Sequence, residues 1–300
     1  MKMIEGGVTA AQGFVAGGIH CGVRKNKSKP DLAMIYSEKP CTAAAVYTRN
    51  LVKGAPILVT QKNLADGTAK AVICNSGNAN TCNADGVEKA QTMCDLAAQA
   101  LGIEPQDVVV ASTGVIGQVL PMEPIQEGIP ELVKTLSPEG SLAAATAIMT
   151  TDTIPKEAAA QVEIGGKTVT LGGISKGSGM IHPNMATMLC FVTTDCAITP
   201  EMLDKAIHQV TEKTFNMISL DGDTSTTDTF AILANGAAGN ETIAAPGPDY
   251  DAFVEALEAV CRQLSKLMAG DGEGATKLLV CQVEGAADPE TAKVVAKSVI

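Results

Sequence analysis

The stretch that decides how this chain is interpreted runs Lys176-Gly177-Ser178-Gly179-Met180-Ile181-His182-Pro183-Asn184-Met185-Ala186-Thr187-Met188-Leu189. A glycine-rich loop leads directly into an apolar, β-branched run that predicts a strand over residues 188–193. If the peptide bond before Thr187 breaks, that residue carries both an alcohol and a free amine. An α-amine has a pKa of about 8, so it can accept the hydroxyl proton at neutral pH. An ordinary loop-to-strand junction has the same pattern, so the segment alone leaves both interpretations open.

The composition predicts a globular protein without a nucleic-acid partner. The chain has 300 residues, 46% of them hydrophobic, which suits one large or two moderate domains. A net charge of −11, an aromatic content of 3% and the absence of Trp argue against surfaces that bind phosphates or stack bases. No apolar run reaches the roughly 18 residues of a membrane span, and the N-terminus lacks a signal-peptide pattern. We therefore expect a cytoplasmic protein with no membrane partner.

Metal and disulfide chemistry are not indicated either. The three histidines, His20, His182 and His208, are not paired at a metal-ligand spacing, and His208 is expected on the solvated side of a helix. The nine cysteines are scattered and include no CxxC pair, so we expect reduced, mostly buried thiols. No bound metal is expected.

Strands and helices are both predicted along the chain, which gives an α/β class. Runs of β-branched and apolar residues predict strands at 32–36, 43–48, 56–60, 71–74, 108–111, 188–193, 230–233 and 278–283. A hairpin is expected to turn at Gly165-Gly166, between strands 160–164 and 168–171. Periodicity and capping residues predict helices over 87–101, 137–149, 199–210 and 249–268.

Several turns gather small polar or charged residues. Ser112-Thr113-Gly114 ends an apolar strand, where a hydroxyl and a backbone N–H can point at one oxygen, as in an oxyanion hole. The cluster 150–153 can hold a polar substrate or finish a helix, and Glu273 between two glycines can meet an ammonium group. The segment 221–228 suits a cation site or a tight acidic turn. Each pattern also occurs at ordinary turns, so none is decisive alone.

Together these segments resemble the ornithine acetyltransferase family, the glutamate N-acetyltransferases of the cyclic arginine pathway. The resemblance spans the chain in family order, through Gly7-Val8-Thr9-Ala10, 75–80, 112–114, 149–153, 176–189, 221–228 and 272–277. It implies a layered α/β sandwich of mixed sheets flanked by helices, with an N-terminal threonine nucleophile made by self-cleavage between Ala186 and Thr187. The expected products are an α chain of residues 1–186 and a β chain of residues 187–300, both in one intertwined body.

The resemblance also implies roles for individual residues. Thr187 is the expected nucleophile, and Thr113 with Gly114 is the expected oxyanion hole. The expected substrate contacts are Thr150, Lys176, Thr187 and Glu273, with the choice of threonine within 150–153 left open. Thr227 stands where the family has asparagine. The family also continues beyond the position of Ile300 with a segment that supplies an asparagine and a threonine or serine to the substrate site, so the resemblance indicates a chain that lacks this segment.

The implied activity is ping-pong transfer of an acetyl group from N2-acetylornithine to glutamate, which gives ornithine and N-acetylglutamate. No cofactor is expected, although acetyl-CoA is a candidate second acetyl donor, and the implied assembly is a heterotetramer of two α and two β chains. An N-terminal-nucleophile aminopeptidase or amidase would share these features but pass the acyl group to water. A non-catalytic binding protein would never cleave itself.

Overall fold

One mixed sheet organises the molecule. The structure is a computed structural model that describes residues 1–181 and 188–300. Within these residues nine strands form the sheet in the order β1-β6-β7-β8-β9-β3-β4-β5, and β2 pairs with β3 beside this path. The strands are β1 (Lys2–Ile4), β2 (Phe14–Ile19), β3 (Leu32–Tyr47), β4 (Thr68–Asn75), β5 (Val108–Ser112), β6 (Lys156–Ile164), β7 (Lys167–Lys176), β8 (Leu189–Thr194) and β9 (Thr229–Ala234).

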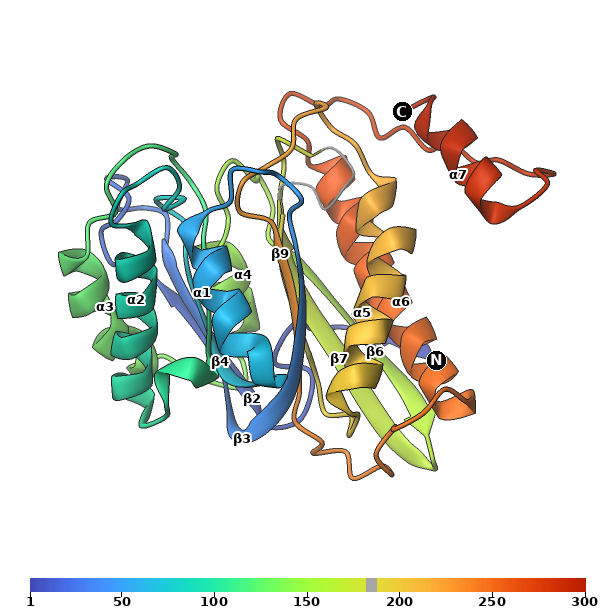
Figure 1. The fold of residues 1–300 in the computed structure, drawn as a ribbon, viewed down its shortest axis with the longest axis horizontal. Coiled ribbons are helices and arrows are strands. Elements are labelled where there is room, and N and C mark those ends of the chain that lie inside the picture. The colour runs from blue at the N-terminus through green and yellow to red at the C-terminus, as the bar shows by residue number, and fades with distance from the viewer. Residues whose placement is uncertain (182–187) are drawn as a thin grey trace.

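Helices pack along this sheet, except the last one, which lies away from it (Figure 1). They are α1 (Ala55–Asn63), α2 (Gly86–Leu101), α3 (Glu123–Lys134), α4 (Ser141–Ala147), α5 (Pro200–Lys213), α6 (Pro248–Gly270) and α7 (Pro289–Lys297). Helices α5 and α6 bury their apolar stripes against β6–β9, while α2 and α3 cover β4 and β5. A third apolar cluster joins α4 to β2 and the middle of the sheet. The chain therefore has a layered α/β fold, as predicted.

The long strand β3 joins the two halves of the sheet. Its first part pairs with β2 and β4, and its second part pairs with β9. The sequence predicted two separate strands here. The structure instead has one continuous strand whose register with β4 shifts between Tyr36 and Cys41, because an irregularity lets a strand bend without ending.

Several local predictions are confirmed. The hairpin of β6 and β7 turns at Gly165 and Gly166, whose φ angles of 55° and 74° fit a two-residue turn with two left-handed residues. Thr199 caps α5 by accepting a hydrogen bond from the Met202 N–H at 3.4 Å. Gly102 ends α2 with a φ of 69°.

Two predicted strands are wrong. Residues 56–60 belong to α1, where Pro56 occupies the first turn and needs no N–H partner; a short apolar run buried on several sides does not distinguish a helix from a strand. Residues 278–283 form no strand, and Leu279 and Val280 are 77% and 79% exposed. No described strand lies beside this segment to complete a hydrogen-bond ladder.

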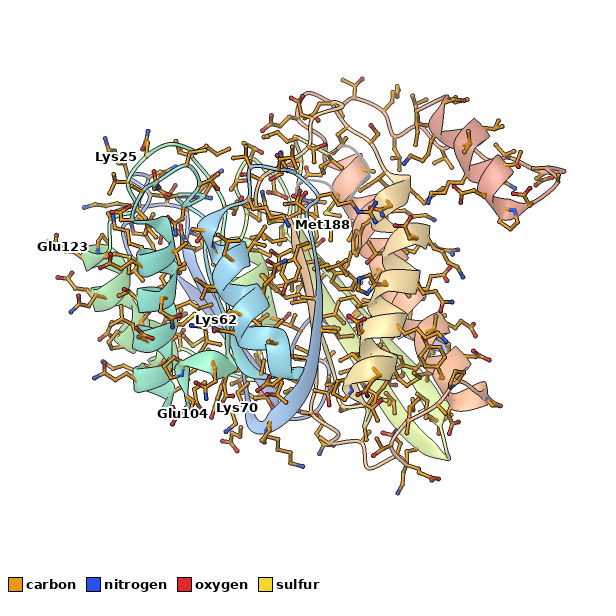
Figure 2. The ribbon with its side chains drawn as sticks, in the orientation of Figure 1. Lys25, Lys62, Lys70, Glu104, Glu123 and Met188 are labelled. Atoms are coloured by element: carbon orange, nitrogen blue, oxygen red, sulfur yellow. The ribbon has the colours of Figure 1, made fainter. Side chains whose placement is uncertain are left out.

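The fold places several loops at one edge of the sheet. Strands β4 and β5 are parallel, so their carboxyl ends meet, and β7 ends where β8 and β9 begin. Met188, directly before β8, is buried at this edge, whereas Lys25, Glu104 and Glu123 lie at the margin of the molecule (Figure 2). Across the described residues, helices that combine the length and the apolarity of a membrane span are absent.

Candidate active site

A cavity of about 630 Å³ opens at the edge where β4, β5 and β7 end. It is lined by every predicted site residue that the structure describes: Thr113, Gly114, Thr150, Lys176 and Glu273. The predicted cleavage bond and nucleophile, Ala186 and Thr187, lie outside the described residues. The other five residues come from distant segments of the sequence and line one cavity.

The Thr113–Gly114 turn presents two free hydrogen-bond donors. The Thr113 N–H donates to the Asn75 carbonyl at 3.0 Å, which fixes the turn beside the loop that follows β4. Gly114 has a φ of 125°, and a Cβ there would lie 2.7 Å from the Gly77 carbonyl carbon, so only glycine fits. Among the described residues, neither the Thr113 hydroxyl nor the Gly114 N–H has an acceptor. Two free donors on adjacent residues are the requirement for binding an oxyanion.

Lys176 brings a buried cation to the same place. It ends β7, is 4% exposed, and its Nζ donates to the Thr113 hydroxyl oxygen at 3.2 Å. Burial lowers the pKa of Lys176, and the nearby carboxyl groups of Asp152 and Asp228 oppose that shift. Because this bond occupies the Thr113 oxygen as an acceptor, the hydroxyl hydrogen stays available for a ligand in the cavity.

Glu273 and Thr150 stand on neighbouring loops of the cavity. The Glu273 N–H donates to the Ser178 carbonyl at 2.7 Å, which holds the 271–275 loop against the loop that follows β7. The Thr150 N–H donates to the Asp152 carboxylate at 3.0 Å. The Glu273 side chain is exposed, so the cavity combines a buried cation with an accessible anion. This arrangement suits a ligand that carries both charges.

Asp228 lies directly beside the residue that precedes β8. Its Oδ1 accepts a hydrogen bond from the Met188 N–H at 2.9 Å, and its Oδ2 is buried with no partner in residues 1–181 and 188–300. Thr48 and Ser225 lie near the carboxyl group and lower its pKa, but the Thr48 hydroxyl donates instead to the Ser225 carbonyl at 2.8 Å. Burial is the largest influence and raises the pKa of Asp228 well above its ordinary value. A carboxyl group whose pKa is raised by burial therefore lies beside the Met188 peptide nitrogen.

Arg24 also lies at this cavity, although no sequence motif indicated it. Its guanidinium lines the cavity and donates to the carbonyls of Ser76, at 3.0 Å from Nε, and Met149. Buried Asp31 shapes the loop that presents it by accepting the Arg24 N–H at 2.7 Å and the Cys21 N–H at 2.6 Å. A buried lysine, Lys156, lies behind the cavity. Neither Arg24 nor Lys156 lies in a recognisable motif. The burial and the hydrogen bonds of both side chains come from tertiary contacts.

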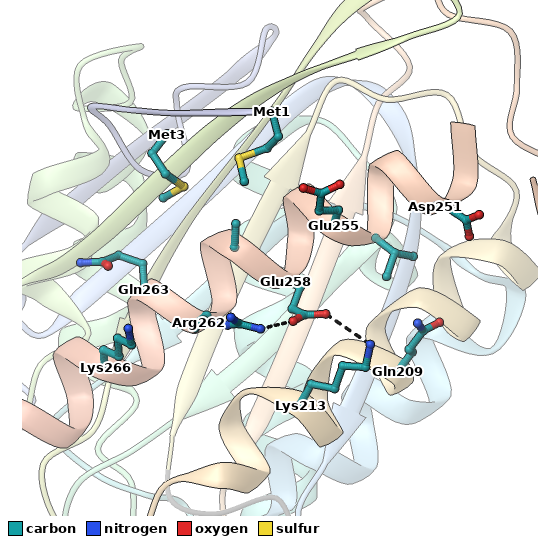
Figure 3. A pocket seen from close by; sticks show the side chains of 12 residues that line it. Met1, Met3, Gln209, Lys213, Asp251, Glu255, Glu258, Arg262, Gln263 and Lys266 are labelled. Atoms are coloured by element: carbon teal, nitrogen blue, oxygen red, sulfur yellow. Dashed lines mark hydrogen bonds and ion pairs between the residues drawn. The ribbon is translucent and has the colours of Figure 1, made fainter. Parts of the chain in front are cut away.

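A second hollow lies between α5, α6 and the N-terminus (Figure 3). Three of its charged side chains pair with one another, since Glu258 contacts Lys213 at 3.4 Å and also contacts Arg262. Lys213 and Arg262 are 54% and 56% exposed, so these pairs are solvated and weak. The described residues also contain no group of three or more potential metal ligands. The cavity at the sheet edge remains the best candidate for chemistry.

These features define a class: an α/β protein whose strands end at a cavity that combines a buried cation, an accessible carboxylate and a turn with two adjacent hydrogen-bond donors. The chain belongs to the ArgJ family, whose model matches residues 15–300. It is 52% identical to the arginine biosynthesis bifunctional protein ArgJ of Symbiobacterium thermophilum, over 100% of this chain and 75% of that protein. The protein of the same name from Bacillus subtilis is 51% identical over 99% of this chain and 73% of its own length.

Solved structures agree with this assignment. The crystal structure of argJ from Bacillus halodurans is 47% identical with a TM-score of 0.58, and the match covers 61% of this chain and 96% of that one. An ornithine acetyltransferase from Mycobacterium tuberculosis, complexed with ornithine, is 37% identical with a TM-score of 0.56, over 61% and 98% of the two chains. A Burkholderia sp. beta-aminopeptidase, 13% identical with a TM-score of 0.52, shares the fold alone.

Proposed function

We propose that this protein transfers the acetyl group of N2-acetylornithine to glutamate through an acetyl-threonine formed at Thr187. The observation that carries the proposal is the sheet-edge cavity, which gathers a buried lysine, two unengaged oxyanion donors and an accessible carboxylate. The names of the relatives, which place them in arginine biosynthesis, and the ornithine bound to one solved relative support it.

In the first half-reaction the Thr187 hydroxyl attacks the acetyl carbonyl carbon while its own α-amine accepts the hydroxyl proton. Thr113 and Gly114 stabilise the negative charge that develops on the carbonyl oxygen. The carbon–nitrogen bond then breaks, and the departing amino group of ornithine takes the proton. In the second half-reaction the neutral amino group of glutamate attacks the ester carbon, its proton passes to the Thr187 α-amine, and the threonine oxygen leaves and is reprotonated.

Charge complementarity between the cavity and N2-acetylornithine explains the choice of acetyl donor in this proposal. The Lys176 ammonium can pair with the α-carboxylate of N2-acetylornithine, and Glu273 can pair with its side-chain ammonium. Thr150 adds a polar side chain to the lining of the same cavity. Acetyl-CoA is proposed as a second acetyl donor, because the relatives are named bifunctional. The chemistry requires no cofactor, and we place the reaction in the cytoplasm.

Self-cleavage between Ala186 and Thr187 would supply the nucleophile and divide the chain into residues 1–186 and 187–300. Chain lengths support this step. The two related crystal chains are matched over 96% and 98% of their own length, yet each accounts for 61% of this chain. The segment before Thr187 is 186 of 300 residues, or 62%. We further propose that two α and two β chains assemble into a heterotetramer.

The decisive experiment combines cleavage with acyl transfer. The native protein should give fragments of 186 and 114 residues on a denaturing gel, and Thr187→Ala should give one uncut, inactive chain. Mass spectrometry should find an acetyl group on the Thr187 fragment after N2-acetylornithine is added, and glutamate should remove it as N-acetylglutamate. Release mainly as acetate would instead establish a hydrolase, and fragments from the Thr187→Ala variant would refute the assignment of the nucleophile.

A further inference from the structure

A buried ion network lies behind the cavity. Lys156, the first residue of β6, is 0% exposed, and its Nζ donates to Asp152 Oδ1 and to Asp271 Oδ2 at 2.6 Å each. Its third donor reaches the Ile154 carbonyl at 3.3 Å. All three N–H groups of the ammonium are therefore used, and none of the three ionised side chains lines the cavity. The network can influence a ligand only through the residues that it holds.

The Asp152 side of the network holds the cationic end of the cavity. Besides Lys156, its carboxylate accepts the Thr150 N–H at 3.0 Å and the Gly177 N–H at 2.8 Å. Gly177 directly follows Lys176, so one carboxylate fixes both the Thr150 loop and the end of β7. Burial raises the pKa of Asp152, but Lys176, Lys156 and the Gly177 N–H outweigh burial, and the pKa lies below its ordinary value. Asp152 is accordingly ionised at neutral pH.

The Asp271 side holds the anionic end. Asp271 follows α6 directly and lies two residues before Glu273. Its carboxylate accepts the Thr153 N–H at 3.0 Å and the Thr153 hydroxyl, which ties the Glu273 loop to the Thr150 loop. Burial raises the pKa of Asp271, but the hydrogen bonds from Lys156 and Thr153 reverse that shift, and the pKa is lowered.

We infer that Lys156 is a positioning residue that sets the separation between Lys176 and Glu273, the two charged groups that receive a ligand with both a carboxylate and an ammonium. Lys156 bridges Asp152, which holds the Thr150 loop and the end of β7, and Asp271, which lies two residues before Glu273. Without its charge, Asp152 and Asp271 would repel each other at close range in a buried environment, and the Glu273 loop would lose one of the contacts that hold it. This inference rests on the proposed function, because it assumes N2-acetylornithine as the ligand.

The test measures the selectivity of the protein between two acetyl donors. N-acetylnorvaline has the same carbon chain as N2-acetylornithine but lacks the side-chain ammonium. The native protein should favour N2-acetylornithine in kcat/KM by about tenfold or more, as one charge-assisted contact provides. The double variant Lys156→Met/Asp271→Asn removes one cation and one anion together, so the net charge of the network is unchanged. Its preference should fall below about threefold, close to the value for Glu273→Gln.

A matched control separates positioning from general loss of stability. Val260→Ala truncates a fully buried side chain of α6 and should lower the melting temperature without changing the donor preference. If the double variant does not melt cooperatively, Asp271→Asn alone, which leaves Lys156 bonded to Asp152, is measured in its place and should also show a reduced preference. A folded variant that keeps the native preference overturns the inference. A native protein that transfers no acetyl group from either donor overturns the proposed function instead.

Discussion

Replacement of Thr113 by alanine tests the oxyanion hole directly. The Thr113 hydroxyl accepts the Lys176 ammonium at 3.2 Å, while its own hydrogen has no acceptor among the described residues. That hydrogen and the Gly114 N–H are the two donors available to the developing oxyanion. Loss of one such donor typically reduces kcat by about 10²–10³-fold, or about 2.7–4 kcal/mol. We expect Thr113→Ala to reduce turnover of N2-acetylornithine by this factor.

The way in which kcat and KM change is as informative as the size of the fall in kcat. A donor that acts mainly in the transition state lowers kcat and kcat/KM together, so KM for N2-acetylornithine should stay within about threefold. Folding should be little affected, because the bond from the Thr113 N–H to the Asn75 carbonyl at 3.0 Å does not involve the side chain. The matched variant Thr113→Ser keeps the hydroxyl and should retain turnover to within about tenfold.

The assay follows ornithine release and N-acetylglutamate formation under steady-state conditions, after a denaturing gel has shown the same degree of self-cleavage in each variant. A fall in kcat of less than threefold for Thr113→Ala would place the oxyanion donors elsewhere. An equal loss in Thr113→Ser would show that the methyl group, rather than the hydroxyl, is responsible. A selective rise in KM would instead indicate that Thr113 acts by orienting Lys176 toward the substrate.

Three further predictions concern folding. Gly114→Ala should cost clearly more stability in urea unfolding than Gly102→Ala. Gly114 has a φ of 125°, and a Cβ there would lie 2.7 Å from the Gly77 carbonyl carbon, whereas a Cβ at Gly102 meets open space. Equal costs would contradict the close approach. Burial raises the pKa of Asp228, so ionisation of this carboxyl group opposes folding once the pH rises above about 4. Asp228→Asn should therefore gain melting temperature relative to the native protein as the pH rises from about 4 to about 8. A difference that does not depend on pH would refute this. Thr60→Val should lose about 2 kcal/mol, because the Thr60 hydroxyl donates to the Val110 carbonyl at 2.7 Å and accepts the Val110 N–H at 2.9 Å; Thr60→Ser should restore most of that loss.

Local patterns predicted the fold class and most elements. Turn glycines, a proline after a helix cap and alternating apolar residues act over a few neighbouring residues, so they can be recognised without knowledge of the fold. The errors occurred where distant segments decide the outcome. Residues 56–60 became helix α1 rather than a strand because they pack across β5, and residues 278–283 have no described strand beside them.

The candidate site shows the same division. Its motifs at 112–114, 150–153 and around Lys176 and Glu273 could be identified from the sequence, and their convergence on one cavity is what the fold provides. Arg24 and Lys156 carried no comparable signal, because an isolated cation in a sequence is ordinarily exposed to solvent. Asp152 and Asp271 lay within recognised motifs, but their roles depend on the buried partner that they share.

The sequence by itself therefore determined the α/β class, the main turns and caps, and a set of chemically suitable residues, because these depend on short-range geometry and on side-chain type. Tertiary structure alone decided that the Thr113 hydroxyl meets a buried Lys176, that Asp228 lies beside the Met188 N–H, and that Lys156 bridges two loops. Most of these contacts join residues that are tens of positions or more apart, and their electrostatics come from burial, which only the assembled sheet and its loops create.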